Sequence, residues 1–188
     1  MSASLRNRLS PPVLIAIALP LLLAVAVAAI AITARVRGVG DPAPPDTRPL
    51  PVAPIDSPAA DGPECNALLA ALPAELPADD APLATRPLAE PVQPGVRAWA
   101  ASPRPAVLRC GLPRPAELTP TSALLEINGV RWLELDDGVP DPVVVTYIAV
   151  DRPVYVALTT PTTAGSGPLQ LVSDVVRTTL PATEVAVR

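Results

Sequence analysis

Few residues in this sequence could take part in chemistry, and a group of acidic residues is the first candidate. Asp136, Asp137 and Asp141 cluster in the segment DDGVPD, and Glu134 lies just before it. Such a cluster can chelate Ca²⁺ or supply the paired carboxylates that hydrolyse glycosidic bonds. Asp-Asp-Gly is also ordinary turn chemistry, and the spacing fits no EF-hand loop. A turn is therefore the favoured interpretation.

Histidine and lysine are absent from the whole sequence. Their absence removes the usual general base near pH 7 and the amine of Schiff-base chemistry. Ser122 and Ser166 have no imidazole to activate them, and neither lies in a G-x-S-x-G elbow. We expect both serines to be turn or cap residues, in a non-catalytic protein that uses no cofactor.

Arginine supplies all fourteen basic residues. Several of them lie close in sequence, and guanidinium groups can grip an anion bidentately or pair with neighbouring acids. Trp99 and Trp132 are large aromatic anchors in a chain without Phe, so we expect them in the core rather than on a ligand platform. The candidate ligand contacts are Arg97, Arg104, Arg109, Arg114, Trp99 and Trp132.

The charge balance of the C-terminal part is acidic. Residues 63–188 carry nine Arg against fourteen Asp and Glu. Proteins that bind nucleic acids need a basic footprint, which this composition lacks. We therefore expect no nucleic-acid partner.

Cys65 and Cys110 are the two cysteines. Two cysteines in one exported domain usually pair, and closing so long a loop contributes about 3–4 kcal/mol in the chain-entropy model. Their wide spacing is unlike that of a redox C-x-x-C motif, and without His they cannot build the usual zinc site. The alternative is two free thiols in a cytoplasmic domain. We expect the disulfide if the domain is exported.

An uncharged apolar run over residues 13–33 dominates the N-terminal part. At about 1.5 Å per residue it spans roughly 30 Å, the thickness of a bilayer's hydrocarbon core. We predict a cytoplasmic head over 1–12 and an uncleaved transmembrane signal-anchor helix over 13–34. A cleaved signal peptide is the alternative, although its apolar region is usually 7–15 residues long.

The proline-rich segment that follows shows no apolar periodicity. Proline recurs every few residues over 35–62, which predicts a disordered tether leaning toward polyproline II. We place the extracytoplasmic domain at 63–188 and the protein in the plasma membrane as a single-pass chain with its N-terminus inside.

Short elements of both kinds predict a small α+β domain. Apolar residues at helical spacing predict helices over 64–72 and 168–180, and residues 77–95 read as a loop. Asn128-Gly129 between two apolar runs predicts a hairpin with a type I′ turn. We expect an antiparallel sheet against the two helices, with strands over 96–100, 106–110, 124–127, 130–135, 143–150 and 153–159.

Three motifs carry a resemblance to a known family. They are Cys-Gly-x-Pro-x-Pro from Cys110, Pro-Thr-Ser from Pro120 and Asn-Gly-Val-x-Trp from Asn128. With the segment from Cys65 to Pro73, they resemble a family of uncharacterised actinobacterial membrane-anchored or secreted proteins, a domain of unknown function, over residues 64–181. The resemblance implies an envelope location, single-pass or lipid anchoring and no established activity. No Cys lies in or just after the apolar run, so anchoring would rest on that run.

These observations favour a non-catalytic, membrane-anchored cell-envelope protein that binds or supports a partner outside the membrane. Its partners would be the lipid bilayer and an envelope protein or cell-wall component. Two alternatives stay open. One is a His-free hydrolase of envelope glycans using Glu134, Asp136 or Asp137, and the other is a small-ligand receptor using the arginines.

Overall fold

The computed structural model describes residues 11–36, 44–135 and 138–187. The chain divides into two compact units, Met1–Pro42 and Ala43–Arg188. Most of the predicted head, residues 1–10, and the carboxylates Asp136 and Asp137 lie outside the described residues.

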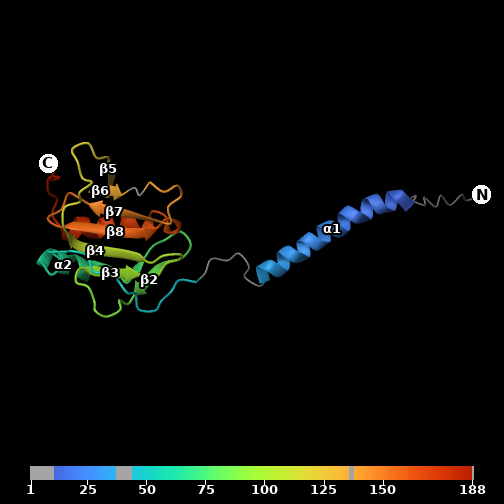
Figure 1. Cartoon of the computed structure of the whole chain (residues 1–188), viewed down its shortest axis with the longest axis horizontal. Coiled ribbons are helices and arrows are strands. Elements are labelled where there is room, and N and C mark those ends of the chain that lie inside the picture. Colours follow the sequence, from blue (N-terminus) through green and yellow to red (C-terminus); the bar gives the residue numbers. More distant parts are fainter. Residues whose placement is uncertain (1–10, 37–43, 136–137, 188) are drawn as a thin grey trace, which may run out of the picture. The chain divides into compact units, whose positions relative to one another are not determined.

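Helix α1, Pro11–Val36, is the described part of the first unit (Figure 1). Its window Ala16–Thr33 has a mean hydropathy of 2.6 and no part of it is buried. Thr33 donates its hydroxyl to the carbonyls of Ala29 and Ile30, so this polar group is satisfied within the helix. The helix is long and apolar enough to cross a membrane, as predicted, and a signal sequence would have the same properties.

The second unit is built on one antiparallel sheet of eight strands, in the order β1-β2-β3-β4-β8-β7-β6-β5 (Figure 1). Strands β1 to β4 form one meander and β5 to β8 form another. The last strands of the two meanders, β4 and β8, pair in the middle of the sheet. The strands are β1 Glu75–Leu76, β2 Leu83–Arg86, β3 Val96–Trp99, β4 Ala106–Leu112, β5 Leu124–Ile127, β6 Val130–Leu135, β7 Val144–Ala149 and β8 Tyr155–Pro161.

Helices α2, Pro63–Ala71, and α3, Gly167–Thr179, cover one face of the sheet and contact each other. Both have a proline in the first turn, where its missing N–H costs no hydrogen bond. The apolar stripe of α3 packs into the main core beside Trp99 and Trp132. Trp132 donates its indole N–H to Ser173 Oγ at 2.9 Å, and Ser173 donates to the Leu169 carbonyl. The buried polar groups of Trp132 and Ser173 are thus paired with each other and with the helix backbone.

A disulfide joins Cys65 in α2 to Cys110 in β4, as predicted. The two Cα atoms lie 5.6 Å apart, and both residues are buried in the main core. The disulfide fixes α2 to β4, in the central part of the sheet.

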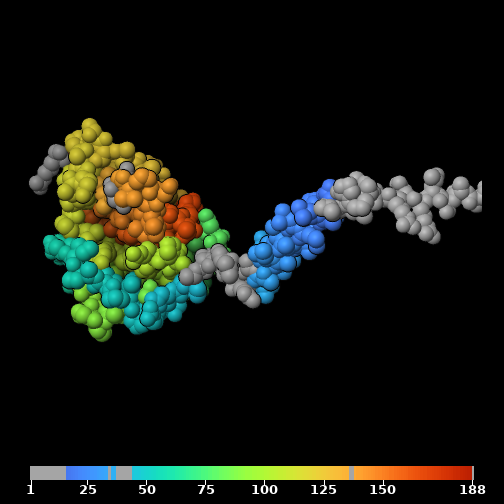
Figure 2. All heavy atoms as spheres, turned by 45° about the vertical axis from the view of Figure 1, so that its right-hand side comes forward, coloured from blue at the N-terminus to red at the C-terminus, as the bar shows by residue number. Residues whose placement is uncertain are grey.

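The opposite face of the sheet has a smaller apolar cluster around Leu133, Ile148 and Ala157. Residues 44–60, here called the N-terminal strap, run along the unit instead of forming the free tether expected over 35–62. Leu50 exchanges backbone hydrogen bonds with Pro87 and Ala89, of 2.8 and 2.9 Å, and forms a parallel bridge with Leu88. In Figure 2 the cyan atoms of this part of the chain pack against the rest of the unit.

The predicted α+β class, both helices and the predicted strands are confirmed, with bounds shifted by one or two residues. Two strands, β1 and β2, were not expected. Strand β2 lies inside the predicted loop 77–95, and its burial does not alternate, because Leu83 and Arg86 are buried while the two residues between them are exposed. Period-two alternation, the usual signal of a half-buried strand, is therefore missing there.

Removing the disulfide should destabilise the second unit. We expect the double variant Cys65→Ala/Cys110→Ala to lose about 3–4 kcal/mol of unfolding free energy, because the unfolded chain regains the freedom of a long loop. Both tryptophans lie in the sheet, so their fluorescence during urea unfolding of the full chain in micelles reports on this unit. An unchanged midpoint relative to the oxidised wild type would contradict a structural role.

A methyl group at Gly111 should be far more costly than one at Gly138. Gly111 lies in a bulge of β4 at φ +86°, and a Cβ there would lie 2.3 Å from the Ala60 nitrogen. Gly138 has a similar φ of +70° with nothing within 4 Å of a Cβ. We expect Gly111→Ala to cost about 2–4 kcal/mol and Gly138→Ala about 1 kcal/mol in the same urea assay. Equal losses would show that the strap is not packed against this glycine.

Candidate functional site

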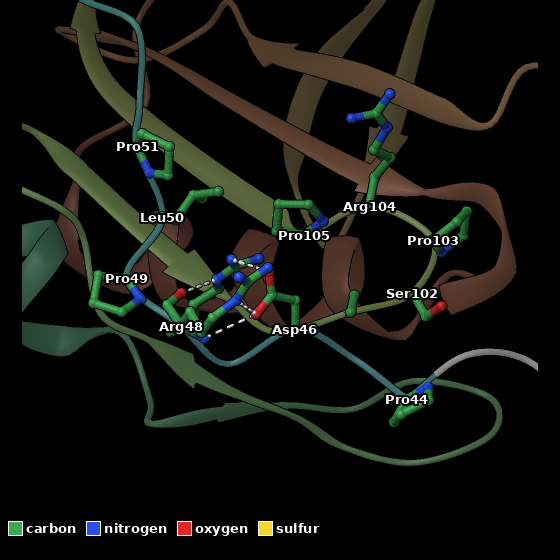
Figure 3. A pocket seen from close by; sticks show the side chains of 12 residues that line it. Pro44, Asp46, Arg48, Pro49, Leu50, Pro51, Ser102, Pro103, Arg104 and Pro105 are labelled. Atoms are coloured by element: carbon green, nitrogen blue, oxygen red, sulfur yellow. Dashed lines mark hydrogen bonds and ion pairs between the residues drawn. The ribbon is translucent and has the colours of Figure 1, made fainter.

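A hollow of about 730 Å³ lies between the N-terminal strap and the loop that joins β3 to β4 (Figure 3). Arg86 contributes to it from the end of β2. Its lining is unusual for this acidic chain, because it holds three guanidinium groups and one carboxylate. The remaining walls come from proline, alanine, serine and leucine. The charged residues are Asp46, Arg48, Arg86 and Arg104.

The carboxylate of Asp46 is held by two arginines. Arg48 donates its backbone N–H and Nε to Oδ1 and its Nη2 to Oδ2, each at 3.0 Å. Arg86 Nη2 lies 3.0 Å from the same Oδ2. The hydrogen bonds from the Arg48 side chain and backbone hold the pKa of Asp46 well below its usual range, and Asp46 in turn raises the pKa of Arg48.

Arg86 fixes this cluster to the sheet. Only 6% of its side chain is exposed, and its Nε donates to the Arg48 carbonyl at 2.7 Å. Arg48 itself is 85% exposed and owes its position to Asp46 and to the backbone. The strap is therefore attached to β2 by a buried guanidinium and a neighbouring carboxylate.

Arg104 lies on the rim of the hollow and is exposed. Its side chain points away from Asp46 in Figure 3, and within the described part of the chain it makes no ion pair or hydrogen bond. Of the arginines singled out in the sequence, this one alone lines the hollow, and its neighbours there are Arg48 and Arg86.

The other predicted arginine contacts donate to backbone carbonyls. Arg97 donates to Leu69 at the end of α2, at 2.9 Å, where a cation also suits the helix dipole. Arg109 donates to Ala53 of the strap at 3.1 Å, and its burial lowers its pKa. Arg114 donates to Ala186, Pro115 and Leu118 and so ties down the C-terminal segment. These three side chains do not meet in one place.

Trp99 and Trp132 are fully buried in the main core. Trp99 donates its indole N–H to the Pro73 carbonyl at 3.3 Å, and Trp132 is bonded to Ser173. Neither presents a face to solvent, so the expectation of a core role is confirmed.

The carboxylate cluster is described only in part. Asp141 is exposed at φ +54°, a left-handed conformation that Asp tolerates in turns. Glu134 is exposed on β6 and, together with burial, raises the pKa of Tyr147 on β7. Glu134 and Glu117 line a separate hollow of about 550 Å³. The described residues hold no group of three or more His, Cys, Asp or Glu that could bind a metal ion.

A buried ion pair between Asp151 and Arg152 was not anticipated from the sequence, where the two residues read as a turn. Asp151 Oδ1 lies 2.9 Å from Arg152 Nη1, and Asp151 Oδ2 accepts the backbone N–H of Arg131. Arg152 also donates to the Gly129 carbonyl at 2.8 Å. The pair thus stabilises the turn of the β5–β6 hairpin. Two adjacent residues of opposite charge do not by themselves indicate a buried ion pair, so the sequence did not predict it.

The fold and site define a small disulfide-linked α+β domain behind an apolar N-terminal helix, with an arginine-lined hollow. The chain belongs to the family described as "Protein of unknown function (DUF3515)", whose model matches residues 15–185. This match covers most of α1 and nearly all of the second unit. No curated protein and no solved structure matches the sequence.

The Asp46 cluster should make part of the unit's stability depend on pH. A carboxyl whose folded-state pKa is depressed stabilises the fold above its unfolded pKa, about 3.9, and this contribution is lost as the pH falls through the folded value. We therefore expect Asp46→Asn to be less stable than wild type at pH 5–7 and the difference to shrink as the pH falls below about 4. Urea midpoints across this pH range measure it.

Arg48→Gln provides the control. In that background Asp46 has lost the side-chain hydrogen bonds from Arg48, so Asp46→Asn should have a smaller effect at pH 7. A difference between wild type and Asp46→Asn that stays constant from pH 7 to pH 2 would contradict the pairing.

Proposed function

We propose that this chain is a single-pass protein of the plasma membrane whose second unit lies outside the cell and acts as a non-catalytic binding or accessory module of the envelope. The observation that carries the proposal is the buried Cys65–Cys110 disulfide in a unit that follows an apolar helix. Disulfides persist in oxidising compartments and are rare in the cytosol. A domain that carries one is expected on the far side of the membrane.

The absence of His and Lys supports a role in binding rather than catalysis. The charged groups at the hollow are guanidiniums and an ionised carboxylate, which recognise charge well but are poor proton-transfer groups near pH 7. The arginine-lined hollow is the surface on which we place recognition.

A carboxylate-dependent hydrolase of envelope glycans is the second candidate. It is favoured by Glu117 and Glu134, which both line the separate hollow of about 550 Å³. Glycan cleavage by the full chain that is lost in Glu134→Gln and retained in Glu126→Gln would replace the binding proposal. Glu126, exposed on β5, is the matched control.

Topology can be tested with alkaline phosphatase, which is active only outside the cytosol, fused after Arg188. We expect an active fusion, and we expect both cysteines to resist alkylation until a reductant is added. Deletion of residues 11–36 should abolish activity because the exporting helix is gone. An inactive fusion with freely alkylated thiols in the full chain would overturn the proposal. An N-terminal tag that stays with the membrane fraction would distinguish an anchor from a cleaved signal.

A further inference from the structure

We infer that the hollow lined by Arg48, Arg86 and Arg104 is a binding site for a phosphate group, carried either by a lipid headgroup or by a soluble ligand. The inference deepens the proposed function, on which it rests for the nature of the module. Phosphate binding itself can be measured on the purified chain, independently of where the cell places it.

The first argument concerns the hydrogen bonds of the Arg86 guanidinium. Its side chain is almost entirely buried, yet its Nη1 makes no hydrogen bond to any described residue, while Nε and Nη2 are occupied by the Arg48 carbonyl and by Asp46. A guanidinium carries five N–H donors in a fixed fork. Nη1 is not among the fully buried unpaired atoms of the described residues, so its donors keep access to solvent. Arg86 is held rigidly and lines the hollow, so it can offer its remaining donors there without a loss of side-chain freedom.

The second argument is charge. Three guanidiniums and a single carboxylate leave an excess of two positive charges at the hollow. The rest of the unit is acidic, so this excess is local. Arg48 and Arg104 are exposed and can move toward a ligand, and Arg104 has no partner among the described residues. Arginine forks match the oxygens of phosphate as well as those of carboxylates.

The third argument is that the carboxylate of Asp46 already occupies the position between Arg48 and Arg86 that a bound anion would take. Its two oxygens accept the Nε and Nη2 hydrogens of Arg48 in the fork geometry and contact Arg86 as well. Asp46 lies only two residues after Pro44, where the strap begins, and its side chain is 42% exposed. A phosphate entering the hollow would share or displace this carboxylate, so Asp46 acts as an internal competitor.

The walls fit a group larger than a bare ion. Pro49, Pro51, Pro103 and Pro105 give the hollow rigid apolar sides, and its volume of about 730 Å³ leaves room for a small moiety beside the phosphate. The phosphate of a lipid headgroup would meet these arginine donors. A soluble phosphorylated ligand would meet the same donors.

The test is calorimetric titration of the full chain in phosphate-free maltoside micelles. One arm adds inorganic phosphate, and the other adds dioctanoyl phosphatidylglycerol with dioctanoylglycerol as its uncharged control. We expect Arg48→Gln/Arg104→Gln to weaken binding about tenfold, since charge-assisted hydrogen bonds are lost. Arg177→Gln, which removes an exposed arginine on α3, away from the hollow, should leave the affinity unchanged.

Asp46→Asn supplies the decisive variant, because it should tighten binding several-fold by removing the competing carboxylate. Binding of inorganic phosphate indicates a soluble ligand, and binding of phosphatidylglycerol alone indicates a headgroup. The inference is overturned by binding in neither arm, by an equal loss in Arg177→Gln, or by weaker binding in Asp46→Asn while its urea midpoint shows a folded unit. None of these results bears on the topology of the chain, so the two proposals fail separately.

Discussion

The pairing of β4 with β8 is the interaction on which the second unit depends. Each meander alone is a four-stranded sheet with two open edges, and the two become one sheet only where β4 and β8 meet. Strand β4 also carries Cys110, which is bonded to α2, and Gly111, whose carbonyl accepts the strap's Ala59 N–H at 3.2 Å. The disulfide, the pairing with β8 and the strap thus converge on Cys110 and Gly111, two adjacent residues of β4.

The site follows from this arrangement. The strap is held by hydrogen bonds to Gly111 and Arg109 and by the bridge of its Leu50 to Leu88. Its first residues therefore lie at the end of β2, where Arg86 is buried. The loop between β3 and β4 closes the other side of the hollow. The hollow would lose one of its two sides if the segment before α2 were a free linker. The hollow is therefore a product of tertiary packing rather than of any local motif.

Local signals predicted much of the fold. Asn128 and Gly129 both have positive φ, as the type I′ turn requires, and the flanking strands have the expected bounds. The apolar spacing of Leu169, Val172 and Val176 predicted α3 because one helical face must be buried. The disulfide was predicted from the number of cysteines and from the expected export of the domain. Each of these features is specified by residues close together in the chain or by a simple count.

What the sequence did not predict depends on distant partners. Asp46 and Arg86 are far apart in the chain and neither lies in a motif, so their pairing has no local signature. The strap reads as a polyproline tether, because its prolines suit an extended chain whether or not that chain is packed. Arg97, Arg109 and Arg114 are close in sequence, but strand alternation and the turn after β4 send them to different carbonyls.

The two outer strands of the sheet, β1 and β5, are short. Strand β1 has two residues, and β5 has four, as do β2 and β3. An outer strand exposes unpaired N–H and C=O groups that can recruit a neighbouring molecule, and brevity is one of the ways in which natural sheets prevent this. Molecules crowded side by side on a surface collide often and in similar orientations. With so little free backbone at either margin, this domain offers its own copies a poor template for β-aggregation.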